Sequence, residues 1–124
     1  MGPLDVSLAW NTSDIIGVHR YLQRLWRNVV DEETGMVHID DAAADDETRR
    51  LLHRTIAAVS ADMNALRFNT AIARLTELNN RLTAVVARDG SAPREIVEPL
   101  VLMTAPLAPH IAEEIWNLVG HSST

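Results

Sequence analysis

The chain has 124 residues, 47% of them hydrophobic, with three Trp, one Tyr, one Phe and no cysteine. This length suits a single domain, and the excess of aliphatic over aromatic residues favours helices over aromatic-rich strands. The lack of cysteine excludes disulfides, a Cys-based zinc site and a thiol nucleophile, and it is typical of the reducing cytoplasm, where we expect this protein. No apolar run approaches the roughly 18 residues of a membrane span, so we expect a soluble protein.

The formal net charge of −6 argues at first against a polyanionic partner. However, eight of the 17 acidic residues lie between Asp31 and Glu47, a stretch without arginine or lysine. The rest of the chain carries 11 basic residues against 9 acids, a net charge of about +2. Every basic residue is arginine, which suits bidentate contacts with phosphate or carboxylate, although a GC-rich genome would explain the same preference.

The N-terminal third predicts a junction, a helix and a loop. Residues 1–12 show no helical period, so we expect an extended junction there. From 13 to 30 apolar residues recur every three or four positions, which predicts a helix capped by Ser13. Its apolar face comprises Ile15, Val18, Leu22, Leu25, Trp26 and Val29. Residues 31–44 are acidic with a short apolar alternation at 36–39, and they predict a surface loop or a small excursion.

Two further helices are predicted in the middle of the chain. One begins at Asp45 or Asp46, because acids favour the positive end of the helix dipole, and runs to about Leu66. Its buried face comprises Leu52, Ile56, Val59, Met63 and Leu66. The next is predicted over 70–88 with Asn69 as its N-cap. Its core face comprises Ile72, Leu75, Leu78, Leu82, Val85 and Val86.

The C-terminal part is divided by glycine and proline. Gly90 is expected to end the third helix, since glycine tolerates the left-handed conformation of a helix C-terminus. Several prolines follow, so one straight helix cannot span the remainder. We expect a helix over 93–104, a proline-bounded joint, a short helix over 109–119 and a frayed tail at 121–124. Four to five helices with short connections predict an all-α helical bundle over 13–120.

Two rows of arginine are candidate binding surfaces. One follows an i, i+4, i+7 spacing on the first helix, opposite its apolar face, and comprises Arg20, Arg24 and Arg27. Such a stripe either binds phosphate or is an ordinary solvated face. The other recurs every seventh residue along the third helix and comprises Arg67, Arg74, Arg81 and Arg88. These side chains are equally suited to covering the core, and Glu77 is spaced to pair with Arg81.

The remaining polar and aromatic clusters indicate structure rather than chemistry. His110, Glu113 and Glu114 are helical neighbours, but the two-His arrangement of HExxH metal sites is missing. No nucleophile or oxyanion cradle accompanies the two carboxylates, so we expect neither a metal site nor a catalytic site. Trp26 and Trp116 are expected to be core anchors rather than base-stacking platforms.

Three segments resemble the anticodon-binding domain of class Ia aminoacyl-tRNA synthetases. Residues 66–72 read LRFNTAI and are similar to the family's RFNTAI element. Residues 102–116 read LMTAPLAPHIAEEIW and are similar to its APxxPHxAEExW signature. Residues 1–27 resemble the junction MGP…W…GxxRFLxRxWR of bacterial-type leucyl-tRNA synthetases, with Tyr21 where Phe is more usual. The acidic stretch 31–47 has no counterpart, so no role transfers to it.

The resemblance implies a helical module that packs beside the catalytic core of a leucyl-tRNA synthetase and docks on the body of tRNA(Leu). It implies that ATP, Mg²⁺ and leucine bind in that core, whose HIGH and KMSKS motifs do not occur here. We therefore expect no cofactor, metal or catalytic residue in this chain, no membrane or DNA partner, and a monomeric isolated domain. The expected tRNA-facing residues are Arg20, Arg24, Arg27, Arg67 and Asn69. A module that only packs on its parent protein, with little affinity for tRNA, is the alternative.

Overall fold

The structure, a computed structural model, describes residues 12–120. Most of the predicted junction 1–12 and the whole predicted tail 121–124 therefore lie outside the described residues. Within them the chain forms five helices and two very short strands: α2 (Thr12–Val29), β1 (Ile39–Asp40), α3 (Asp46–Asn64), α4 (Phe68–Asp89), β2 (Ala92–Pro93), α5 (Arg94–Thr104) and α6 (Pro109–Leu118). The prediction of an all-α helical bundle is confirmed, and each predicted helix is present.

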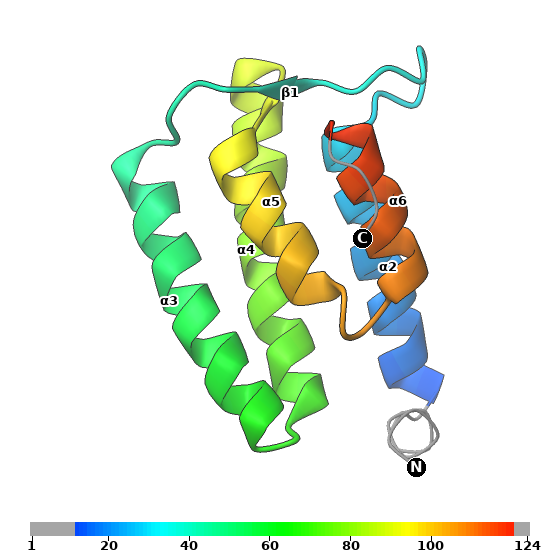
Figure 1. Ribbon diagram of the computed structural model, residues 1–124, viewed down its shortest axis with the longest axis vertical. Coiled ribbons are helices and arrows are strands. Elements are labelled where there is room, and N and C mark those ends of the chain that lie inside the picture. Colours follow the sequence, from blue (N-terminus) through cyan, green and yellow to red (C-terminus); the bar gives the residue numbers. More distant parts are fainter. Residues whose placement is uncertain (1–11, 121–124) are drawn as a thin grey trace.

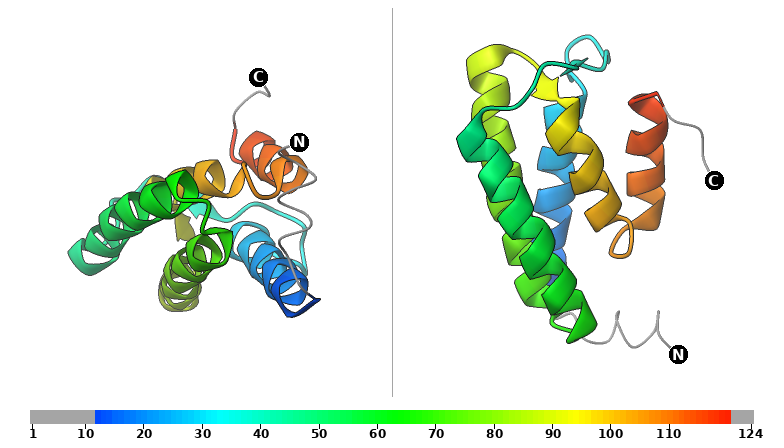
Figure 2. Two further views of the ribbon diagram at one scale, coloured as in Figure 1. Left: turned by 90° about the horizontal axis from the view of Figure 1, so that it is seen from below. Right: turned by 60° about the vertical axis from the view of Figure 1, so that its left-hand side comes forward.

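The helices alternate in direction along the chain, and α4 is the central one (Figure 1). It packs between α3 and α2, while α5 lies against α4 and α3, and α6 lies against α5 and α2. Figure 2 shows that α5 and α6 cover one side of α4 and α2. Among the residues described, no helix covers the opposite, outer side of α4.

The core is aliphatic, as the composition predicts. Its largest fully buried side chains come from four helices: Leu25, Leu75, Leu78, Leu82, Ile96, Leu100 and Ile115. Trp26 and Trp116 are half-buried and pack against this core. The prediction that Ile15 is buried is wrong, because it lies near the start of α2, where no described helix covers it, and is 56% exposed.

The α3–α4 turn differs from the predicted one. The Arg67 N–H donates to the Asp62 carbonyl at 2.7 Å and the Leu66 N–H donates to the Met63 carbonyl at 3.1 Å, which is the hydrogen-bond pattern of a Schellman motif. Leu66 occupies the left-handed position of that motif with φ 59°. The prediction that Leu66 is buried is therefore wrong, since the turn directs it into solvent. The predicted N-cap, Asn69, is also wrong, because α4 already begins at Phe68.

The segment between α2 and α3 is more ordered than a loop. Val30 forms an antiparallel bridge with Val37. Further on, Ile39–Asp40 pairs in parallel with Ala92–Pro93, so that the segment lies across the upper end of the bundle in Figure 1. The small excursion expected at 31–44 is thus a short strand pairing that joins the two halves of the chain. Its position also brings Asp45 to the N-cap of α3.

Candidate nucleic-acid interface

A buried polar seam joins α2 to α4. The Asn28 side-chain amide donates to Asn79 Oδ1 at 2.8 Å and to Thr83 Oγ1 at 3.1 Å. The Asn79 amide donates in turn to the Tyr21 carbonyl at 3.3 Å. Both amide side chains are almost completely buried, where polar groups require partners. These bonds fix the register of α2 against α4, and with it the relative position of the residues that point outward.

An open pocket of about 310 Å³ lies beside this seam, on the outer side of the two helices. Its lining residues are Gly17, Arg20, Tyr21, Arg24, Ile72, Thr76, Asn79 and Asn80. The buried Tyr21 and Asn79 lie at its base, while the exposed Arg20, Arg24 and Asn80 lie at its edge. Gly17 keeps one wall open, because a Cβ added there would meet no atom within 4 Å.

The edge of this pocket is rich in hydrogen-bond donors, and no carboxylate is among the described residues that line it. Arg24 Nη1 donates to Asn80 Oδ1 at 2.5 Å, so its partner is neutral and its charge is not compensated. Within the described part of the chain, Arg20 has no hydrogen bond or ion pair. Guanidinium groups without acidic partners attract anions with several acceptor oxygens, above all phosphate.

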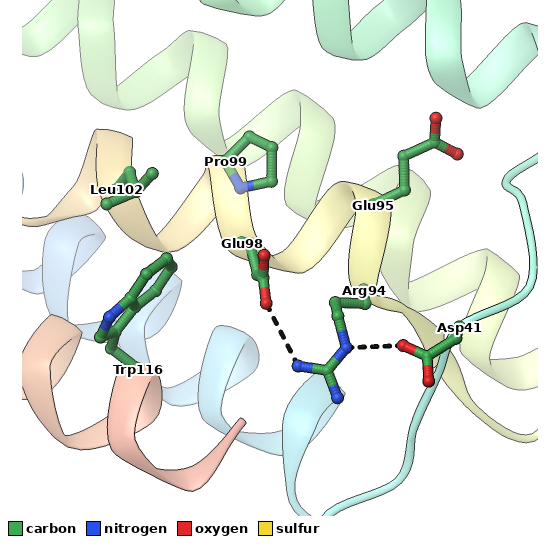
Figure 3. A pocket seen from close by; sticks show the side chains of 7 residues that line it. All are labelled: Asp41, Arg94, Glu95, Glu98, Pro99, Leu102 and Trp116. Carbon is green, nitrogen blue, oxygen red and sulfur yellow. Dashed lines mark hydrogen bonds and ion pairs between the residues drawn. The ribbon is translucent and has the colours of Figure 1, made fainter. Parts of the chain in front are cut away.

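Two other pockets that contain an arginine differ in this respect. In the pocket of about 380 Å³ shown in Figure 3, Arg94 lies 2.7 Å from Asp41 and 3.1 Å from Glu98. In a pocket between α2 and α6, Arg27 lies 3.1 Å from Glu32. Both arginines are already compensated by carboxylates. The α2–α4 pocket is therefore the stronger candidate for binding an anion.

The arginines that recur every seventh residue point to the opposite flank of α4, where α3 supplies acids. Arg67 and Arg74 pair with Asp62. Arg81 lies 3.1 Å from Asp45 and 3.5 Å from Glu47, so it reaches α3 rather than the predicted partner Glu77.

Arg88, the last arginine of this row, pairs with Asp45 and Asp89. Hydrogen bonds from Thr48, together with the charge and hydrogen bond of Arg81, hold the pKa of Asp45 well below its usual range. This flank is a chain of ion pairs between helices, and its charges largely compensate one another.

The structure does not bring the five residues predicted to face tRNA together in one place. Arg20 and Arg24 share the α2–α4 pocket, while Arg27 borders the pocket toward α6. Arg67 lies on the α3 flank of α4, and Asn69 is exposed in the first turn of α4.

Thr76 and Asn80 complete the α2–α4 pocket and were not among the predicted site residues. Their signal was a spacing of four and eight residues from Ile72, which puts all three on nearly one side of the helix. The spacing indicates a shared site only when α2 is known to pack beside α4.

Comparison with known proteins agrees with this architecture. Residues 45–124 match the family model described as the anticodon-binding domain of tRNA ligase. The chain belongs to this family. Over all 124 residues it is 57% identical to a leucine–tRNA ligase of Saccharopolyspora erythraea, 58% to one of Nocardia farcinica and 56% to one of Streptomyces avermitilis. The chain spans 13% of the length of each of these relatives.

The anticodon-binding domain model covers α3 to α6 but not α2, which begins at Thr12. The pocket therefore joins α4, which lies inside the matched region, to a helix that this chain shares with the leucine–tRNA ligases. Residues 12–120 contain no helix long and apolar enough to cross a membrane. The same residues contain no group of three or more His, Asp or Glu side chains placed to hold a metal ion.

Proposed function

We propose that this chain is the tRNA-binding module of a leucine–tRNA ligase and that it docks on the body of tRNA(Leu). The observation that carries the proposal is the α2–α4 pocket, where Arg20 and Arg24 lie together without an acidic partner among the described residues. The pocket lies on the outer side of α4, which no described helix covers. The names of the relatives supply the class of RNA. Contacts of this kind hold the phosphate backbone, so they position the tRNA without reading its sequence.

The proposal ranks the five predicted residues. Arg20 and Arg24 are ready for a phosphate, because neither must give up an ion pair. Arg27 contributes less, since it must exchange a carboxylate for a phosphate oxygen. The charge of Arg67 is shared with Asp62. Asn69 contributes a neutral hydrogen bond from the start of α4.

The chemistry of leucylation belongs, in this proposal, to the remainder of the ligase. Leucine, ATP and Mg²⁺ bind outside this segment, which needs no cofactor of its own and neither activates leucine nor charges tRNA. The proposal is supported by the small share of the relatives that the chain spans. The parent enzyme is expected in the cytoplasm, where tRNA is used.

The test is the double substitution Arg20→Ala/Arg24→Ala in the full-length ligase that carries this segment. We expect tRNA(Leu) to bind about ten-fold more weakly at about 50 mM salt, and the slope of log affinity against log salt to fall by about 2. Leucine-dependent ATP–pyrophosphate exchange without tRNA should not change, because the leucine and ATP sites are untouched.

The matched control compares the single variants Arg20→Ala and Arg49→Ala. Each removes one positive charge, but Arg49 lies between α3 and α5 and is paired with Glu95 at 2.8 Å. Arg20→Ala should weaken binding and Arg49→Ala should not. Unchanged affinity in the double variant would refute the proposal and support a module that only packs on its parent protein.

A further inference from the structure

Asp62 occupies an unfavourable place for a carboxylate. It lies in the last turn of α3, near the negative end of the helix dipole. The residue is only 5% exposed, and its Oδ2 accepts no hydrogen bond. Burial and the missing hydrogen bond each cost free energy at this position. A carboxylate held under these conditions calls for a role other than folding stability.

The contacts of Asp62 suggest that role. Its Oδ1 lies 3.4 Å from Arg67 Nε and its Oδ2 lies 3.8 Å from Arg74 Nε. In both ion pairs the nearest guanidinium nitrogen is Nε, and neither guanidinium makes a hydrogen bond within the described part of the chain. The two side chains are 61% and 50% exposed. One buried carboxylate thus lies between two arginines that are at least half exposed, and the three side chains together keep a net positive charge.

The backbone reinforces this arrangement. The Arg67 N–H donates to the Asp62 carbonyl at 2.7 Å, so Asp62 holds Arg67 through both its main chain and its side chain. The turn that makes this bond places Leu66 at φ 59°, a conformation that disfavours a side chain such as leucine. Left-handed strain of this kind accumulates where a precise geometry matters.

Ile72 and Thr76 of the α2–α4 pocket come from the first half of α4. The Asp62 cluster lies beside the same half of this helix, on the flank that faces α3. Asn69, Thr70 and Ala73 are exposed and small, and they come from that half of the helix. A polynucleotide backbone can therefore approach α4 closely and reach both flanks.

We propose that Arg67 and Arg74, held by Asp62, form a second phosphate-binding clamp that acts on the same RNA as the α2–α4 pocket. This inference rests on the proposed function. Each arginine, paired with Asp62 on its Nε side, offers its two terminal nitrogens as a fork to phosphate oxygens. Asp62 is a positioning residue: it reduces the rotamer freedom that two long side chains would otherwise lose on binding.

The variant Asp62→Asn separates positioning from plain electrostatics by the sign of its effect. It nearly preserves the shape of the side chain and raises the net charge beside Arg67 and Arg74 by one. If Asp62 only compensates charge, the substitution should strengthen RNA binding. If Asp62 positions the clamp, tRNA(Leu) should bind the full-length ligase about five-fold more weakly, measured by fluorescence anisotropy at about 100 mM salt.

The matched control is Glu47→Gln, which makes the same charge change at the other end of the contact between α3 and α4. Glu47 is 80% exposed and pairs with Arg81 at 3.5 Å, so its removal should leave affinity equal or slightly higher. The clamp also predicts that Arg74→Ala weakens binding less in the Asp62→Asn background than in the native protein. Tighter or unchanged binding by Asp62→Asn overturns the clamp.

A second variant applies if Asp62→Asn lowers the thermal unfolding midpoint enough to obscure the result. Arg67→Lys/Arg74→Lys keeps both charges but removes the Nε contact and the planar fork. It should weaken tRNA binding about five-fold, and unchanged affinity would overturn the clamp. If Arg20→Ala/Arg24→Ala weakens binding while these variants do not, the clamp is wrong and the proposed function stands. If none of them weakens binding, the proposed function itself fails.

Discussion

The two flanks of α4 are both lined with arginine, yet they differ in what the neighbouring helix supplies. On the α3 flank, Arg67, Arg74, Arg81 and Arg88 each meet a carboxylate. On the α2 flank the partners are amides, hydroxyls and backbone carbonyls. Within residues 12–120, Arg24 makes a hydrogen bond only with Asn80, and Arg20 makes no hydrogen bond or ion pair. The spacing of arginines along a helix therefore locates a basic row, whereas the facing helix decides how far carboxylates compensate its charge.

The largest expected effect concerns the buried polar seam between α2 and α4, which positions the residues of the α2 flank. Asn79→Ala removes one of the two side-chain acceptors of the buried Asn28 amide and the side-chain donor to the Tyr21 carbonyl. Because buried polar groups lose their partners, we expect the free energy of unfolding to fall by about 2 kcal/mol, measured by urea denaturation. Asn80→Ala, on the exposed edge of the pocket, should change it by less than about 0.5 kcal/mol. Equal losses would mean that the amide seam does not hold α2 on α4.

The next effect concerns Asp45, one of the acids on the α3 flank of α4. Asp45 caps α3 by accepting from the Thr48 N–H at 3.1 Å and also pairs with Arg81. We expect Asp45→Ala to lower the free energy of unfolding by about 1 kcal/mol at neutral pH. The neighbouring Asp46→Ala is the control, since Asp46 is 81% exposed and lies 3.9 Å from Arg49. It should have a smaller effect.

The pH dependence of Asp45→Ala follows from the lowered pKa of Asp45 in the folded protein. A carboxyl whose pKa is lower in the folded than in the unfolded state stabilises fully above the unfolded value, about 3.9 for Asp. That contribution is lost as the pH falls toward the folded value. The difference in stability between native protein and variant should therefore persist from pH 7 to about 4 and shrink below it. A difference that stays constant in acid would contradict this account of the α3 flank.

The helices of this fold could be predicted from local signals, but the contacts between distant elements could not. Gly90 is a local signal: it adopts φ 80° and ends α4 where the sequence indicates. Leu66 fits the helical period equally well and is nevertheless exposed, because the turn to α4 overrides the period. Strand β1 pairs with Ala92–Pro93, more than 50 residues away, and no local pattern reveals such a partner.

The candidate site was predictable to the same extent. Arg20 and Arg24 share a face by spacing alone, and the structure places them in one pocket. Thr76 and Asn80 join them only through the packing of α2 on α4. The Asp62 contacts of Arg67 likewise depend on a turn geometry that the sequence did not indicate.

The smallest expected effect comes from freeing one arginine from the carboxylate that compensates its charge. Arg27 belongs to the α2 stripe but lies 3.1 Å from Glu32, and both side chains are about 60% exposed. Such an exposed pair contributes less than about 0.5 kcal/mol to stability, so Glu32→Gln should leave unfolding nearly unchanged. It should nevertheless raise tRNA(Leu) affinity about two-fold at low salt, and the gain should vanish as salt screens the freed charge. Glu33→Gln removes the same charge from the next position, where no arginine is paired, and should have less effect. An equal gain in both variants would assign the change to net charge and remove Arg27 from the proposed interface.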